Sequence, residues 1–91
     1  MATVADLIAI DPKNVTRSLL QGAEKLSAAP ADATFDFSTV QQIDAGGVHA
    51  LEQVARIANE KSVHIVLRAV NVDVYKVLKL VKLTQRFSFE N

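Results

Sequence analysis

One stretch of this 91-residue chain places a carboxylate, two glycines and a histidine within six positions. It reads Asp44-Ala45-Gly46-Gly47, and His49 follows two residues later. A glycine turn that leads into a helix leaves backbone N–H groups unpaired, which suits an anion or a polar group of a partner. The same glycines could do no more than allow a tight turn before the helix. Both interpretations stay open from these residues alone.

Enzyme chemistry finds little support in the residue types. His49 and Asp44 could form an acid–base pair, which keeps a small enzyme as an alternative. Ser38 lacks the glycines of a nucleophile elbow and a matched His–Asp pair, and no lysine follows the glycines as a phosphate-binding loop requires. His64 has no carboxylate or second histidine at ligand spacing, and the chain contains no Cys. We predict a chain that is not an enzyme and holds no metal and no cofactor.

The residues before this stretch predict a strand and a helix. Met1–Ile10 is apolar and favours a strand. Asp11 suits a helix cap and Pro12 the first helical position. The helix should fade by Ala28 or Ala29, because Pro30 disfavours a helical residue before it. A loop over Ala29–Ala33 follows.

The stretch itself predicts a strand, a turn and a helix. Phe35–Phe37 forms the expected strand, and Gln41 and Gln42 mark a polar turn. The helix should run from Asp44 to about Glu60 with a buried face of residues at three- and four-residue steps. That face comprises Val48, Leu51, Val54, Ala55 and Ala58, and the opposite face comprises His49, Glu52, Gln53, Arg56 and Asn59.

The last third predicts two further strands and a helix. Val63–Ala69 is β-branched and apolar, and we expect a strand that is packed on both sides for most of its length. Asn71 or Asp73 could cap a helix over Val72–Leu83, and Phe87–Phe89 suggests a short final strand. The buried face of this helix should hold Val74, Val77, Leu78 and Val81, with Lys76, Lys79 and Lys82 on the other side.

Strands that alternate with helices predict an α/β fold built from βαβ units. We expect a sheet of about four mostly parallel strands, with right-handed crossovers and three helices packed mainly on one face. At 91 residues the chain, residues 1–91, should form a single domain. The hydrophobic fraction of 49% exceeds that of a disordered chain.

Charge and hydropathy exclude several classes of partner. Ten basic and ten acidic residues give a formal net charge of zero, which argues against nucleic-acid binding. No apolar run approaches the roughly 20 residues of a spanning helix, so we expect no membrane insertion. The first ten residues carry no Lys or Arg and do not resemble a secretory signal, which makes the cytoplasm the expected compartment.

Several short motifs resemble those of the STAS domain of anti-sigma factor antagonists. They are Asp36-Phe37-Ser38, the run Ile43-Asp44-Ala45-Gly46-Gly47-Val48, and Ala50-Leu51. Family members typically carry D-L-S-x-V, D-S-x-G-L and a following A-L or L-L. The strand Ile65–Leu67, the Val70-Asn71 turn and Tyr75–Leu83 also fit the C-terminal half of the family. The resemblance covers Phe35 to Phe89 well and the first helix loosely.

The chain departs from the family in two places. The phosphorylatable Ser or Thr of the family falls at Ala45, which has no hydroxyl, so the usual kinase switch would be absent. Ser38 and Thr39, just upstream, are the substitute candidates for phosphorylation. The family also usually has two strands before its first helix, whereas only ten residues precede Asp11 here.

The resemblance implies a bacterial regulatory binding module that engages a protein partner through the loop and helix after Asp44. The implied partner-binding residues are Asp44, Ala45, Gly46, Gly47, His49, Gln53 and Arg56. The partner would be an anti-sigma factor or a related kinase-like protein. The alternative is the cytoplasmic STAS subunit of an ABC-type phospholipid transporter for lipid asymmetry, whose D-x-G-G loop and V-Y pair match Asp44–Gly47 and Val74-Tyr75. That subunit binds the ATPase subunit. The sequence leaves open whether the chain forms oligomers.

Overall fold

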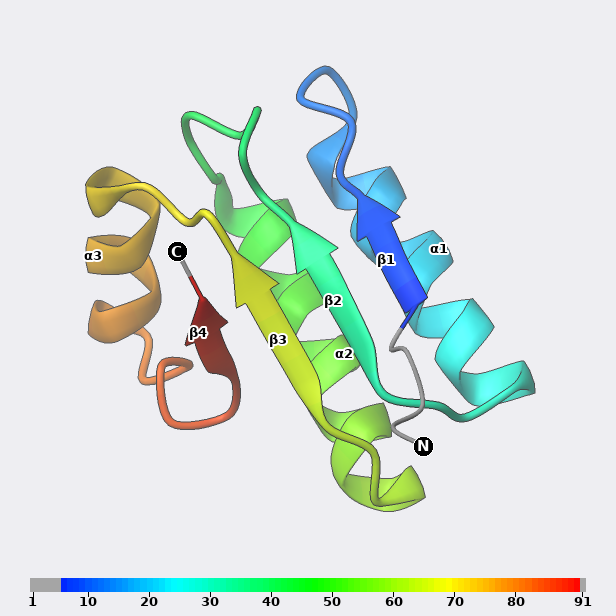
Figure 1. The fold of residues 1–91 in the computed structure, drawn as a ribbon. Coiled ribbons are helices and arrows are strands. Elements are labelled where there is room, and N and C mark those ends of the chain that lie inside the picture. The colour runs from blue at the N-terminus through cyan, green and yellow to red at the C-terminus, as the bar shows by residue number, and fades with distance from the viewer. Residues whose placement is uncertain (1–5, 91) are drawn as a thin grey trace.

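The computed structural model describes residues 6–90, in which strands and helices alternate from β1 to β4 (Figure 1). Their order agrees with the order predicted from the sequence, and the bounds differ by a few residues. The strands are β1 Asp6–Ala9, β2 Ala33–Asp36, β3 Ile65–Arg68 and β4 Ser88–Glu90. The helices are α1 Val15–Ala28, α2 Ala45–Lys61 and α3 Val72–Leu80. The N-terminal half of the predicted strand Met1–Ile10 lies outside the described residues.

The four strands form one parallel sheet in the order β1-β2-β3-β4. Ile8 pairs with Phe35, Phe35 with Leu67, and Leu67 with Phe89, so one row of apolar residues crosses the whole sheet. Parallel neighbours require crossover connections, and each helix supplies one of them. The predicted α/β fold with a parallel four-stranded sheet is confirmed.

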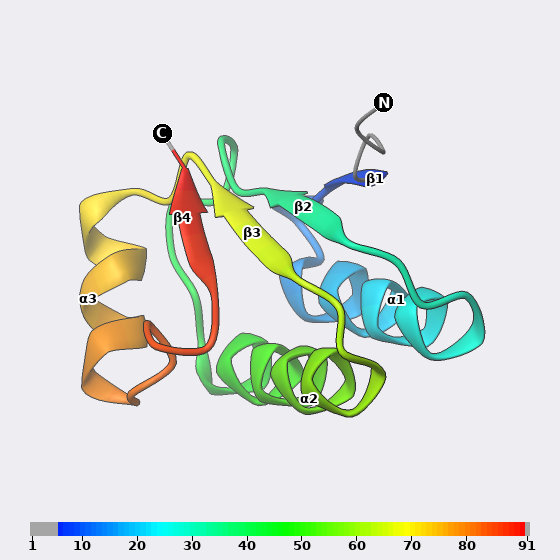
Figure 2. The same ribbon diagram turned by 60° about the horizontal axis from the view of Figure 1, so that its bottom comes forward.

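Helices α1 and α2 lie side by side beneath one face of the sheet, and α3 stands beside β4 at the sheet's end (Figure 2). The core forms between this helix pair and the sheet. Its largest fully buried side chains are Phe35, Phe37, Leu19, Leu51, Leu67, Leu78, Val54 and Val74. Leu51, Val54, Val74 and Leu78 among them belong to the faces that the helical periodicity predicts to be buried.

No element within residues 6–90 covers the second face of the sheet, which corrects the expectation that β3 is packed on both sides for most of its length. Ile65 and Leu67 are buried against the helices, whereas Val66 is only partly buried and Arg68 is exposed. Leu7 on β1 is 58% exposed. Helices α1 and α2 both lie on the face that holds Ile65 and Leu67. The β-branched residues of β3 therefore do not indicate a second covering layer.

Helix α1 begins later than the sequence predicts. Asn14 occupies the N-cap position and Val15 is the first helical residue. The prediction of Asp11 as cap and Pro12 as first residue is wrong, because the Asp11 carboxylate accepts a hydrogen bond from the Lys13 backbone N–H at 2.9 Å. Such a local turn competes with helix formation.

Helix α3 ends at Leu80 rather than at the predicted Leu83. Lys82 has a left-handed backbone with φ 63°, and the N–H of Leu83 donates to the carbonyl of Leu78 at 2.8 Å. This hydrogen bond, which spans six residues, ends the helix and reverses the direction of the chain. Leu83 is thereby buried, whereas Val81, predicted to face the core, is 40% exposed.

Candidate functional site

The loops that follow β1, β2 and β3 meet at one edge of the sheet, which we call the carboxyl edge (Figure 1). The middle loop, residues 37–44, carries the predicted site and is fixed from both sides. The Thr39 hydroxyl donates to the carbonyl of Ile10 at 3.2 Å. On the other side, the Asn71 amide donates to the carbonyls of Val40 and Gln41 at 3.2 and 3.1 Å. The loop is therefore held in place before any partner arrives.

Asp44 ends this loop as the N-cap of α2, a role that the sequence analysis did not assign to it. Its backbone is extended, and its carboxylate accepts a hydrogen bond from the Gly47 N–H at 2.9 Å. The bond satisfies one of the N–H groups that a helix leaves unpaired at its start. The turn from Asp44 to Gly47 is thus the first turn of a well-capped helix.

The two glycines of this turn are required by close packing rather than by backbone freedom. Neither has a positive φ, so neither uses the backbone conformation that favours glycine. A Cβ on Gly47 would lie 2.6 Å from Cγ1 of Ile43, and a Cβ on Gly46 would lie 3.1 Å from Oγ1 of Thr16. The neighbour of Gly47 is therefore the loop that precedes it.

Ala45 is exposed at the first position of α2. His49 and Arg56 are exposed on the outer side of the same helix, and Gln53 is partly buried between them. The Gln53 amide lies 3.4 Å from Nε2 of His49. Gln53 and Arg56 also line a shallow hollow of about 330 Å³ on this helix. All seven predicted partner-binding residues thus belong to one turn and one helix.

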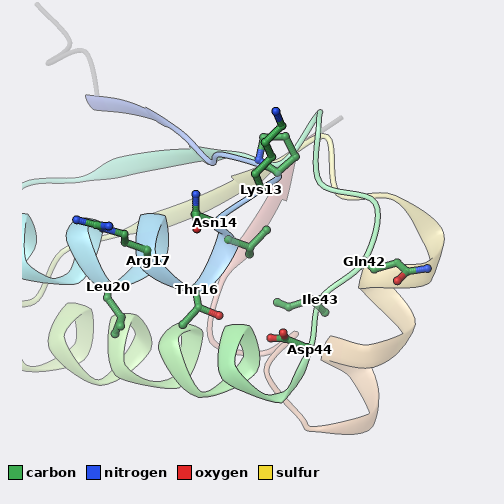
Figure 3. Close-up of a pocket in the computed structure, with 10 residues that line it drawn as sticks. Lys13, Asn14, Thr16, Arg17, Leu20, Gln42, Ile43 and Asp44 are labelled. Atoms are coloured by element: carbon green, nitrogen blue, oxygen red, sulfur yellow. The ribbon is translucent and has the colours of Figure 1, made fainter.

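A larger hollow of about 550 Å³ lies beside Asp44, between the starts of α1 and α2 (Figure 3). One wall, formed by the start of α1 and the turn before it, includes Lys13, Thr16 and Arg17, and the other wall includes Ile43 and Asp44. Lys13, Thr16 and Arg17 were not among the site residues predicted from the sequence. The only feature of the sequence that could have indicated these residues was the order of strands and helices. The loops that follow adjacent parallel strands meet at one edge of the sheet.

The charges around this hollow are mostly positive and unpaired. Lys13 and Arg17 are exposed, and neither forms an ion pair within residues 6–90. His49 does not line the hollow, and its ring lies 3.8 Å from the carboxylate of Glu52. Asp44 is the one acidic residue that lines the hollow. An acidic group of a partner would meet favourable charge here.

The alternative of an acid–base pair gains no geometric support. In the described part of the chain, the side-chain partners of His49 are Glu52 and Gln53, and the Asp44 carboxylate is used by the helix cap. No group of three or more potential metal ligands occurs within residues 6–90. None of the described helices is long and apolar enough to cross a membrane.

The two substitute phosphorylation candidates differ in their surroundings. Both Ser38 and Thr39 are exposed, but the Thr39 hydroxyl is engaged with Ile10. The Ser38 N–H donates to the Asp36 carboxylate at 2.9 Å, and the Ser38 hydroxyl also binds it. These hydrogen bonds, more than the nearby Arg68 charge, lower the pKa of Asp36. Ser38 therefore lies beside a carboxylate that stays ionised.

Comparisons with known proteins agree with this geometry. The fold matches the crystal structure of a protein from Thermotoga maritima (tm1081) that is assigned as an anti-sigma factor antagonist. The match has a TM-score of 0.74 at 16% identity and covers 99% of this chain and 83% of that chain. A search of curated proteins found no match. The family model of the STAS domain matches residues 3–91. The chain therefore belongs to the STAS domain family.

Proposed function

We propose that this chain is a non-enzymatic, cytoplasmic binding module that acts as an anti-sigma factor antagonist. Its partner surface is the Asp44–Gly47 turn with His49, Gln53 and Arg56 on the outer side of α2. The observation that carries this proposal is that Ala45 is exposed at the first position of α2. It directly follows a loop that hydrogen bonds hold from both sides. A rigid, exposed turn lowers the entropy cost of binding.

The proposal extends this surface to the start of α1. Lys13, Thr16 and Arg17 share the hollow with Asp44, so a partner that covers the turn also reaches them. Lys13 and Arg17 form no ion pair with any other described residue, and their positive charges favour a partner with an acidic contact segment.

The surface lacks the usual phosphorylation switch, because Ala45 offers no hydroxyl to a kinase. In phosphorylated members of the family, a phosphate brings about two negative charges and repels the partner. This chain would stay permanently in the form that binds. If a switch exists elsewhere in the loop, its candidates are Ser38 and Thr39, which are both exposed and whose hydroxyls bind the Asp36 carboxylate and the Ile10 carbonyl.

A second candidate function is the accessory STAS subunit of an ABC-type phospholipid transporter. It rests on the paired glycines Gly46 and Gly47 and on the Val74-Tyr75 pair in α3. In that case the same turn would contact the ATPase subunit. The two functions differ in the partner and share the surface.

The test is Ala45→Asp, which places one negative charge where the family carries its phosphate. A carboxylate in the first turn of a helix is tolerated or stabilises it by about 0.3–1 kcal/mol, so the melting temperature should hardly change. Binding should weaken at least tenfold, through repulsion and desolvation in the interface. The matched control is Ala45→Asn, which has the same size without the charge.

The probes are the anti-sigma factor and the transporter ATPase subunit encoded in the same genome, titrated by calorimetry beside melting curves. The probe that binds the parent chain decides between the two functions. If Ala45→Asp folds and binds as tightly as Ala45→Asn, the interface lies elsewhere and the proposed surface is wrong.

A further inference from the structure

The outer side of α3 concentrates apolar surface that no other described element shows. The large exposed hydrophobic residues of the described chain are Leu7, Val72, Tyr75, Leu80 and Val81. All except Leu7 lie on α3 or directly after it. Leu80 is 82% exposed and Val72 is 67% exposed. Exposed apolar side chains that gather on one element mark an interaction surface.

Two of these residues, Val72 and Leu80, lie on one side of α3 together with two lysines. Val72, Lys76 and Leu80 follow one another at four-residue steps, and Lys79 lies beside them on the same side. We call these four residues the α3 stripe. The buried residues of α3 are Val74 and Leu78, which face the opposite way. The stripe runs the length of the nine-residue helix, about 13 Å at 1.5 Å per residue.

The charge of the stripe is positive. Lys76 and Lys79 are exposed and form no ion pair within residues 6–90, and Lys82 follows just after the helix. Asp73 is the one acidic residue of α3. An occupant with acidic and apolar side chains would complement this surface.

Two other occupants fit less well. In a two-fold dimer through α3, the lysines of one copy would approach those of the other, and like charges repel. An anionic membrane is recognised by clusters of about four to eight basic residues, whereas the stripe and Lys82 together supply three.

We propose that the α3 stripe is a second contact surface for the protein partner of this module, and that its occupant is an acidic amphipathic helix of that partner. The inference rests on the proposed function, because it assigns a second surface to the same partner. Asn71, the cap of α3, also binds the carbonyls of Val40 and Gln41 in the loop that leads to Asp44. The start of α3 therefore lies beside the loop that leads to the first surface.

The test uses two substitutions with matched controls. Leu80→Gln removes the most exposed apolar side chain of the stripe, and Leu7→Gln makes the same change on the open sheet face. Lys79→Glu reverses a charge in the last turn of α3, and Lys61→Glu does so in the last turn of α2. All four side chains are exposed, so each variant should fold, which a melting curve checks.

The probes are again the anti-sigma factor and the transporter ATPase subunit encoded in the same genome. Leu80→Gln and Lys79→Glu should each weaken binding of the probe that the parent binds by at least tenfold. Leu7→Gln and Lys61→Glu should change it less than twofold. A photo-crosslinking residue placed at Leu80 should attach to a partner segment with acidic residues and with apolar residues at helical spacing.

The outcomes separate this inference from the proposed function. If Ala45→Asp abolishes binding while Leu80→Gln and Lys79→Glu leave it unchanged, the α3 inference is overturned and the proposed function stands. A parent chain that binds neither probe contradicts both. If the chain dimerises and Leu80→Gln abolishes the dimer, the stripe binds a second copy and the inference is overturned. If the chain binds phosphatidylglycerol vesicles and Lys79→Glu abolishes this binding, the stripe binds a membrane and the inference is also overturned.

Discussion

At the scale of single residues, Gly47 shows how tightly the site is packed. Its N–H is bound by Asp44, and a Cβ at this position would lie 2.6 Å from Cγ1 of Ile43. Gly47→Val should lower the free energy of unfolding by about 1–3 kcal/mol, because overpacking displaces the Ile43 side chain. Urea denaturation measures the loss.

A double variant shows whether the contact with Ile43, rather than a general intolerance of substitution at Gly47, causes this loss of stability. Ile43→Ala removes the atoms that a larger side chain at Gly47 would meet, so the double variant should lose less than the sum of the two single losses. Strict additivity of the two losses would show that the Ile43 contact is not the reason for the glycine.

At the scale of elements, Asn71 couples α3 to the loop that carries the site. Its Oδ1 accepts from the Val74 N–H at 2.8 Å, and its Nδ2 donates to the carbonyls of Val40 and Gln41. Asn71→Ala should lower the free energy of unfolding by about 1–2 kcal/mol through loss of the cap. Asn71→Asp keeps the cap acceptor and loses the two donated bonds, so it should cost less.

Chemical denaturation of both variants tests this role against Asn59→Ala, a control on the exposed side of α2. Equal effects of Asn71→Ala and Asn59→Ala would contradict the role of Asn71. The sequence named Asn71 and Asp73 as alternative caps. The structure assigns Asn71, because only its side chain both caps the helix and reaches the neighbouring loop.

At the scale of the whole molecule, α1 and α2 share the sheet's covered face, whereas α3 is attached at its end (Figure 2). Only Val74 and Leu78 of α3 are buried, compared with six residues of α2. An element with few buried apolar residues opens locally at lower free energy than the core. The amides of α3 should therefore exchange with solvent faster than those of α2.

Hydrogen exchange followed by mass spectrometry or NMR measures this difference in the free chain. The same measurement with a bound partner shows whether α3 becomes protected. Exchange of α3 as slow as that of α2 in the free chain would mean that α3 unfolds only together with the core.

The sequence by itself determined the type and order of the elements and the parallel sheet. These depend on local signals: helical periodicity in Leu51, Val54 and Ala58, and β-branched apolar runs such as Val63–Ala69 between the helices. The start of α1 that the sequence predicts is too early. The Asp11 side chain accepts a hydrogen bond from the Lys13 N–H in a local turn, and residue types alone do not distinguish such a turn from a helix cap.

Only the tertiary structure decided which segments lie beside Asp44 and which faces stay open. Lys13, Thr16 and Arg17 line the hollow at Asp44 because β1 and β2 pair in parallel, and strand pairing joins residues far apart in the sequence. The open face of β3 likewise follows from both large helices lying on one side of the sheet. Periodicity shows that a face is apolar, but burial depends on what the rest of the chain places against it.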